Sequence, residues 1–142
     1  FQNYSLIPVM TAQENAEYIM LLQGVPAAER RERVAAVFRE VGLTGLEGRF
    51  PRELSGGQQQ RVAIARAIVA NPSVVLADEP TANLDSRTSS SLLDLMAQLN
   101  AERGITFVFA THDTKLMRRA KQLLWLRDGQ IDPNGAPHEV LA

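Results

Sequence analysis

Two short apolar runs, separated by one helical segment, constrain the fold of this chain more than any other feature. Residues 73–77 (Ser-Val-Val-Leu-Ala) and residues 105–110 (Ile-Thr-Phe-Val-Phe-Ala) are almost unbroken apolar runs, and residues 86–103 carry apolar side chains at helical spacing. Runs of this kind are typical of parallel strands that are covered on both faces. Strand, helix and strand within about 38 residues form a βαβ unit, whose right-handed crossover makes the two strands parallel. The sequence therefore predicts an α/β fold.

The first third of the chain predicts helices. A helix is expected over about residues 12–23, and Gly24-Val25-Pro26 ends it. A second helix is expected over residues 27–41, because its apolar side chains recur every three or four residues. We therefore divide the chain into a loop and helical part, residues 1–53, and an α/β part, residues 54–142.

The end of the chain predicts a short β-hairpin. Asp128-Gly129 lies between the apolar residues 123–126 and 130–131, and Asp-Gly between two apolar segments is a strong hairpin signal. Shorter helices are expected over residues 57–70 and 114–120. The last ten residues predict a loop followed by a final turn of helix.

Composition excludes several classes of function. The 142 residues hold 15 Lys+Arg against 16 Asp+Glu, a formal net charge of -1, so no strong positive field favours nucleic acid or anionic lipid as a partner. The absence of cysteine excludes disulfides, thiolate zinc sites and cysteine catalysis in this sequence. No apolar run approaches the roughly 20 residues that cross a bilayer, so a link to a membrane is expected to come through a partner.

The segment Leu54-Ser55-Gly56-Gly57-Gln58, which we call the signature turn, precedes a predicted helix. One interpretation is a capping box, in which Ser55 caps the helix and Gln58 reaches back to it. That interpretation leaves the two adjacent glycines unexplained. Glycines let a phosphate approach bare backbone N–H groups, and a helix N-terminus carries a partial positive charge. The segment therefore also predicts a phosphate contact.

Two acids follow the first apolar run. Asp78 and Glu79 lie at the expected C-terminal end of a strand, which is where ligands bind in open α/β sheets. Asp78 suits a Mg²⁺ ion, which prefers few carboxylates together with phosphate oxygens. Glu79 is suited to orient or deprotonate an attacking water. The alternative is that both acids merely solvate the end of a strand.

Three further positions are candidates in context only. Asp85, in Asn83-Leu84-Asp85, is placed to cap the helix that follows. His112, in Thr111-His112-Asp113, follows the second apolar run, and parallel pairing would bring it beside the two acids, where an imidazole can donate to a terminal phosphate. Gln2 carries no meaning by itself.

The order of these motifs resembles the nucleotide-binding subunit of ABC transporters. The resemblance implies a partial P-loop NTPase (RecA-like) fold, in which a parallel sheet is flanked by helices, with an inserted helical subdomain and a C-terminal β-hairpin. Residues 1–53 would hold the Q-loop and the helical subdomain, and residues 54–142 the C-terminal part of the ATPase core. Within the family, residues 2–8 and 11–15 resemble the lipoprotein-releasing, macrolide-export and cell-division branch, although Gln13 departs from its pattern.

The resemblance also implies a role for each candidate residue. The cofactors would be ATP and Mg²⁺, with Glu79, His112 and Gln2 catalytic and with Asp78 and Gln2 near the metal. The signature turn (Leu54, Ser55, Gly56, Gly57 and Gln58) would bind the nucleotide held by a second ATPase subunit, and Asp85 would couple the two subunits of a homodimer. A transmembrane permease would contact residues 1–53, which places the protein on the cytoplasmic face of the cell membrane.

One element of the family pattern does not occur in these residues. The Gly-rich form G-x-x-x-x-G-K-[ST], which cradles phosphates, is absent. In the family it precedes the Q-loop, so we expect it upstream of residue 1, together with further strands. These 142 residues alone are then expected to bind ATP poorly, to hydrolyse none and to expose apolar surface that favours self-association. Two alternatives remain: a soluble ABC-type ATPase that acts on DNA or ribosomes, and a non-catalytic binding segment.

Overall fold

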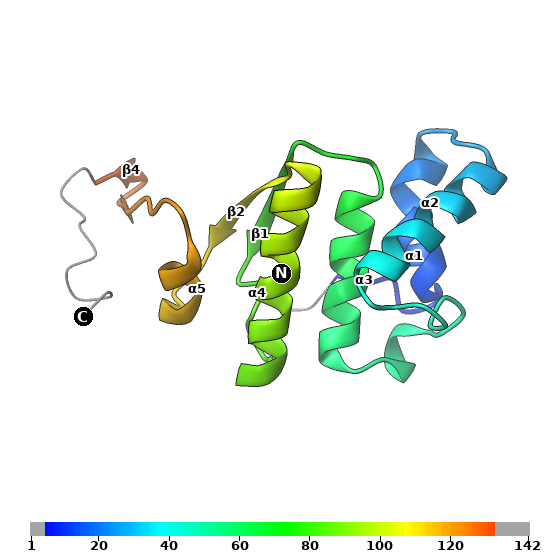
Figure 1. Cartoon of the computed structure of the whole chain (residues 1–142), viewed down its shortest axis with the longest axis horizontal. Helices are drawn as coiled ribbons and strands as arrows, with labels where there is room; N and C mark the ends of the chain where they lie inside the picture. Colours follow the sequence, from blue (N-terminus) through cyan, green and yellow to red (C-terminus); the bar gives the residue numbers. More distant parts are fainter. Residues whose placement is uncertain (1–4, 133–142) are drawn as a thin grey trace.

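The computed structural model describes residues 5–132, which form a row of helices beside one pair of parallel strands and a short β-hairpin (Figure 1). Gln2 and the helical turn expected within the last ten residues lie outside the described range. The elements are α1 (Ala12–Leu22), α2 (Ala27–Glu40), the 3₁₀ turn η1 (Pro51–Glu53), α3 (Gly56–Ile68), β1 (Val74–Asp78), α4 (Ser86–Arg103), β2 (Thr106–Ala110), α5 (Thr114–Arg119), β3 (Leu126–Arg127) and β4 (Gln130–Ile131).

The two apolar runs form a parallel strand pair, as the βαβ pattern predicts. β1 and β2 pair with Val74 opposite Thr106 and Asp78 opposite Ala110. The strands therefore end level with each other, and the residues that follow them leave the sheet at the same edge. This register positions Glu79 beside the segment that begins at Thr111.

The expectation that these strands are covered on both faces is wrong for the described residues. Val75 is buried, but Val74, Leu76 and Val108 keep 51%, 78% and 48% of their surface exposed. In a strand, alternate side chains point to opposite faces, and within residues 5–132 the helices bury only the face to which Val75 belongs. The other face is an apolar surface open to solvent.

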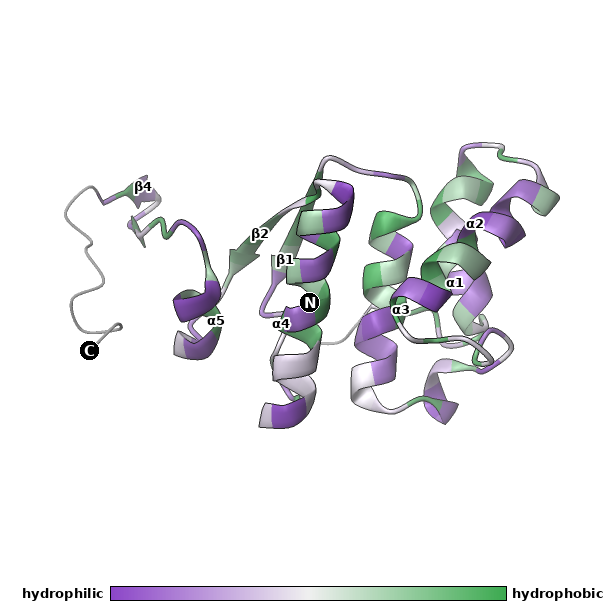
Figure 2. Ribbon diagram, in the orientation of Figure 1, coloured by the Kyte–Doolittle hydropathy of each residue, from purple (hydrophilic) through white to green (hydrophobic). Residues whose placement is uncertain are grey.

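The helices pack in a layer beside the sheet. α1 and α2 lie at one end of the molecule, α3 lies between them and α4, and the strands follow on the far side of α4 (Figure 1). The buried apolar side chains of α1–α4 belong to one core cluster, and the ribbons of these helices carry both hydrophobic and hydrophilic bands (Figure 2). The largest fully buried side chains include Phe38, Met20, Leu43, Ile68 and Leu92.

Local signals set most helix ends. Thr11 caps α1, where its hydroxyl accepts from the N–H of Glu14 at 3.2 Å and the Glu14 carboxylate accepts the Thr11 N–H at 2.7 Å. Gly104 ends α4 in the left-handed conformation, at φ 68°, which glycine adopts at little cost. α3 ends at Ile68, two residues before its expected end.

The predicted hairpin forms, but its strands are short. β3 and β4 pair antiparallel, with Leu126 opposite Ile131 and Arg127 opposite Gln130. The expected strand over residues 123–126 contributes only its last residue. The hairpin lies at the end of the described chain opposite α1 and α2 (Figure 1). No helix within residues 5–132 combines the length and the apolar character needed to span a bilayer.

Candidate functional site

The candidate site is built at the edge of the sheet where β1 and β2 end. The first loop, residues 79–85, follows β1, and the second loop, residues 111–113, follows β2. Glu79 begins the first loop with φ 45°, a left-handed conformation that non-glycine residues adopt only when their surroundings hold it. Its N–H donates to the carbonyl oxygen of Ala110 at 2.8 Å. This bond anchors the turn to the neighbouring strand.

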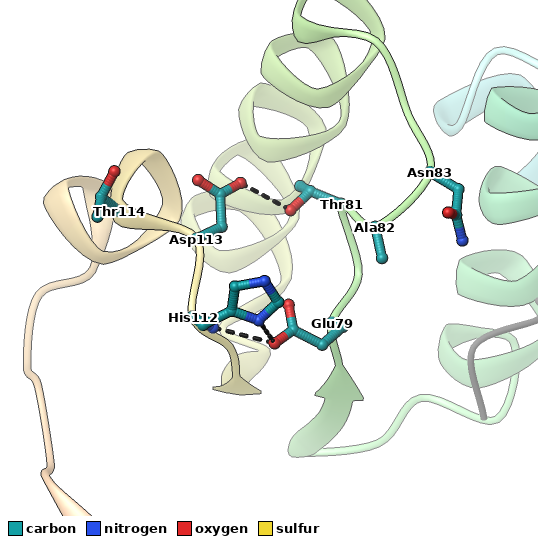
Figure 3. A pocket seen from close by; sticks show the side chains of 7 residues that line it. All are labelled: Glu79, Thr81, Ala82, Asn83, His112, Asp113 and Thr114. Atoms are coloured by element: carbon teal, nitrogen blue, oxygen red, sulfur yellow. Dashed lines mark hydrogen bonds and ion pairs between the residues drawn. The ribbon is translucent and has the colours of Figure 1, made fainter.

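The Glu79 carboxylate is held by the second loop through both of its oxygens. Oε1 accepts from the backbone N–H of His112 at 3.0 Å and lies 2.5 Å from Nδ1 of the same residue. Oε2 accepts from the hydroxyl of Thr111 at 2.9 Å. Figure 3 shows the Glu79 and His112 side chains pointing toward each other across the gap between the loops.

These contacts set the charge of the carboxylate. Burial raises the pKa of Glu79, but the hydrogen bonds from Thr111 and His112 lower it by more, so its pKa lies below the ordinary value. Glu79 is therefore ionised at neutral pH. The imidazole of His112 is 91% exposed and Glu79 is 26% exposed, so a ligand from solvent has access to both.

A second bond joins the same two loops. The hydroxyl of the buried Thr81 donates to Oδ2 of Asp113 at 2.9 Å, and Oδ1 of Asp113 accepts from the N–H of Lys115 at the start of α5. Burial raises the pKa of Asp113, but the bonds from Thr81 and from backbone N–H groups outweigh it, so the pKa is lowered. The carboxylate of Asp113 therefore both caps α5 and fixes the first loop.

An open depression of about 570 Å³ lies between the two loops. Its lining contains both charged and small side chains, namely Glu79, Thr81, Ala82, Asn83, His112, Asp113 and Thr114. Figure 3 shows these side chains arranged around it, with Asn83 apart from the bonded pairs. The sequence predicts that Glu79 and His112 lie together, and the structure brings them together. The sequence did not predict the part played by Thr81, Thr111 or Asp113, because no local pattern marks a side chain that forms a hydrogen bond between two loops.

Asp78 lies one residue before this group and is exposed at the end of β1. Within residues 5–132 no group of three or more His, Cys, Asp or Glu side chains is placed to hold a metal ion. A metal at Asp78 would therefore take most of its ligands from phosphate and water. That donor set fits Mg²⁺, which binds proteins through one or two carboxylates.

The signature turn is a capping box, as one interpretation of its sequence predicts. The N–H of Gln58 donates to Oγ of Ser55 at 3.3 Å, and the N–H of Ser55 donates to Oε1 of Gln58 at 2.8 Å. Leu54 is buried at 6% exposure, which anchors the turn. The turn does not line the depression beside Glu79, so within one copy of the chain the two features are separate.

Asp85 caps α4, as its position before that helix predicts. Its Oδ1 accepts from the N–H groups of Arg87 and Thr88, both at 3.0 Å, and its Oδ2 accepts from the Thr88 hydroxyl at 2.5 Å. The hydrogen bond from the Thr88 side chain is the main cause of a lowered pKa of Asp85. Asp85 is exposed, so one edge of it can meet another molecule.

Comparison with known proteins identifies relatives across most of the sequence. A family model described as ABC transporter matches residues 1–82. "ABC transporter ATP-binding protein YtrE" of Bacillus subtilis (strain 168) is 49% identical over 131 residues, which are 92% of this chain and 57% of that protein. "Macrolide export ATP-binding/permease protein MacB" of Syntrophobacter fumaroxidans is 44% identical over 135 residues, which are 94% of this chain and 19% of that protein.

A solved structure shares the fold. The dimeric ATP-binding cassette MJ0796, in a post-hydrolysis state bound to ADP and Pi, superposes with a TM-score of 0.78 at 40% identity. The match covers 93% of this chain and 59% of that one. The chain therefore spans a little over half the length of YtrE and of this cassette.

Proposed function

This chain belongs to the ABC transporter family, and we propose that it forms part of an ATP-binding and ATP-hydrolysing subunit that drives a membrane transporter. The observation that carries the proposal is the 2.5 Å contact between Glu79 and His112 at the level ends of two parallel strands. It places an ionised carboxylate and an exposed imidazole side by side at a strand end, where α/β proteins bind ligands.

In this proposal the chain supplies the C-terminal part of a RecA-like ATPase core. Residues 54–142 belong to that core, and residues 1–53 to the Q-loop and an inserted helical subdomain. The parallel pair of β1 and β2 and the helices beside it support this division, because the strand ends carry Glu79 and His112 while α1 and α2 lie at the far end of the molecule.

Hydrolysis transfers the terminal phosphoryl group of ATP to water. Glu79 accepts a hydrogen bond from the attacking water and orients it, and His112 donates to the terminal phosphate. Asp78 and Gln2 would hold Mg²⁺, which supplies charge neutralisation at the phosphates. The contribution of these side chains is positioning and electrostatic stabilisation, which dominate phosphoryl transfer.

The signature turn acts on the nucleotide of a second subunit. Its position outside the depression beside Glu79 supports this assignment, because a single copy does not bring the two features to one ligand. In a head-to-tail dimer, the start of α3 would present N–H groups and a partial positive charge to the triphosphate. Asp85 would lie at the contact between the two copies. The dimeric form of the related cassette supports this arrangement.

We assign the partner on the membrane side to a transmembrane permease. Residues 1–53 would be its docking surface, on the cytoplasmic face of the cell membrane. The related MacB protein is named as an ATP-binding/permease protein, which supports this pairing. The balanced charge of the chain gives no support to a nucleic-acid partner.

The 142 residues by themselves are expected to bind ATP weakly and to hydrolyse none. They contain no phosphate loop of the form G-x-x-x-x-G-K-[ST], and loss of even one preorganised donor typically costs about 10²–10³ in rate. Nucleotide titration tests this expectation. Saturation of the 142-residue chain at ATP concentrations that saturate the full-length protein would show that the missing loop is not required.

The test of the proposed function is phosphate release by the full-length protein that contains these residues. Glu79→Gln keeps the size of the side chain but removes its negative charge, and should lower the rate by at least about 10²-fold. Glu102→Gln, at an exposed position near the end of α4, is the matched control and should leave the rate unchanged. Unaltered phosphate release by Glu79→Gln would show the proposal to be wrong.

A further inference from the structure

The geometry points to Thr88 as a positioning residue that joins the signature turn to Asp85, so that the two features move as one unit. The inference rests on the proposed function, in which both features act on a second copy of the chain. It assigns a role to a residue of α4 that none of the motifs contains, and it gives Gly57 a second reason to be glycine.

The first contact is steric. A Cβ atom added at Gly57 would lie 2.5 Å from Cγ2 of Thr88 and 3.9 Å from its Cβ. A separation of 2.5 Å is far inside the contact distance of two carbon atoms, which lies near 3.5–4.0 Å. The start of α3 therefore approaches the start of α4 more closely than any residue other than glycine would permit at position 57.

The Thr88 side chain is not free to turn away from Gly57. Its Oγ1 donates to Oδ2 of Asp85 at 2.5 Å, and its own N–H donates to Oδ1 of Asp85 at 3.0 Å. A β-branched side chain in a helix has few χ1 rotamers, and this pair of bonds fixes one of them. The hydroxyl of Thr88 thus holds Asp85 while its methyl group rests on Gly57.

A second contact one turn along keeps α3 and α4 in register. Arg61 of α3 donates through Nη2 to Oγ of Ser91 of α4 at 2.7 Å, and through Nη1 to the carbonyl oxygen of Val41 at 2.7 Å. Residues three or four apart lie on the same side of a helix, so Gly57 and Arg61 present one side of α3 to Thr88 and Ser91. Because both contacts lie along the same side of α3, α3 and α4 cannot rotate relative to each other about either contact alone.

This arrangement has a consequence for the dimer. If the signature turn and Asp85 of one copy shift together, a change at the nucleotide is transmitted to the subunit contact without a change in either helix. A side chain at Gly57 would push α3 from α4 and misplace the turn. A misplacement of about 1 Å can cost on the order of 10²-fold in rate.

The experiment is a double-mutant cycle in the full-length protein, with kcat, KM for ATP and thermal melting as readouts. Thr88→Ser removes Cγ2 and keeps the hydroxyl on Asp85, so it relieves the steric contact alone. Gly57→Ala should lower kcat by about tenfold or more with Thr88 present, and the loss should be at least about threefold smaller with Ser at that position, where only the hindrance to the phosphate remains. Ala97→Ser, at an exposed position of α4, is the control and should be neutral.

Thr88→Val tests the polar half of the inference, because it keeps the branched shape and loses the hydroxyl. It should lower kcat, leave KM for ATP unchanged, and fail to rescue Gly57→Ala. Wild-type kcat in Thr88→Val would overturn the link to Asp85, and equal damage from Gly57→Ala in both backgrounds would overturn the steric link. Glu79→Gln, measured in parallel, distinguishes a failure of the proposed function from a failure of this inference. If Glu79→Gln is inactive while the double-mutant cycle shows no coupling, only the inference about Thr88 is wrong.

Discussion

The hydroxyl of Thr111 donates a 2.9 Å hydrogen bond to Oε2 of Glu79, and the direction of that bond is fixed by a third group. The backbone N–H of Asp113 donates to Oγ1 of Thr111 at 3.0 Å. A threonine hydroxyl has a single hydrogen, and an ionised carboxylate accepts only. Thr111 is therefore an obligate donor to Glu79, and it holds that carboxylate in one orientation from the neighbouring strand's loop.

Substitution of Thr111 should lower catalysis in the full-length protein without preventing nucleotide binding. Thr111→Val keeps the shape and removes the donor, and loss of about 1 kcal/mol of positioning corresponds to roughly a fivefold lower kcat. Thr111→Ser should retain kcat within about twofold, and KM for ATP should stay constant in both. Steady-state hydrolysis is the measurement, with Thr106→Val, at an exposed position of β2, as the control. A serine variant as slow as the valine variant would contradict this account.

Asn15 is predicted to be the main support of the loop before α1. It is fully buried, its Oδ1 accepts from the N–H of Ile7 at 2.7 Å, and its Nδ2 donates to the carbonyls of Ile7, Met10 and Thr11. Asn15→Leu removes the acceptor of the Ile7 N–H and the donor to the Met10 carbonyl, at a cost of about 1–3 kcal/mol in the free energy of unfolding. Urea denaturation of the full-length protein measures it.

A charge at the same position should be no better tolerated. Asn15→Asp keeps the acceptor for the Ile7 N–H but turns a carboxylate toward the carbonyls that Nδ2 now satisfies. An exposed change at the C-cap of the same helix, Gln23→Glu, serves for comparison. Equal urea midpoints for Asn15→Asp and the wild type would show that the loop is held by other contacts.

The bare apolar face of the strand pair predicts self-association of the 142-residue chain. Leu76 is 78% exposed and Val108 is 48% exposed on neighbouring strands. Burial of such surface between copies removes it from water at roughly 25 cal/mol per Å². Light scattering after size exclusion should report a mass above the monomer, and Leu76→Lys with Val108→Lys should shift it toward the monomer. A monomeric unmodified chain would contradict the prediction.

Much of this fold could be predicted from the sequence because its signals are local. The apolar runs and the intervening helix specify a parallel pair, and Thr11, Ser55, Asp85 and Gly104 end helices through bonds to their own neighbours. The register of that pair brings His112 beside Glu79, as expected from the order of the motifs. The prediction that both faces of the strands are covered was wrong for residues 5–132. An apolar run indicates that a strand can be buried on both faces, but it does not show which elements are present to cover them.

The rest of the site depends on contacts between residues far apart in the sequence. Thr81 bonds to Asp113 across 32 positions, and Gly57 contacts Thr88 between two helices. Threonine is common on strands and in loops, so its type does not mark such a partner. The positive φ of Glu79 could not be predicted from the sequence either, because glutamate has no preference for that conformation. The roles of Gln2, Asp78 and the signature turn, and the division at residue 53, stay predictions.

The most direct test of the central claim mixes two inactive variants of the full-length protein. Glu79→Gln disables the catalytic edge, and Ser55→Asp keeps a good helix cap but sets a negative charge against the triphosphate. If the two features of one site come from different copies, a mixed dimer keeps one intact site. Random mixing should then restore up to about a quarter of wild-type hydrolysis, since half of the dimers are mixed and each retains one of two sites. No recovery, with mixed dimers verified by two affinity tags, would contradict the claim that Glu79 and Ser55 of opposing copies act on the same nucleotide.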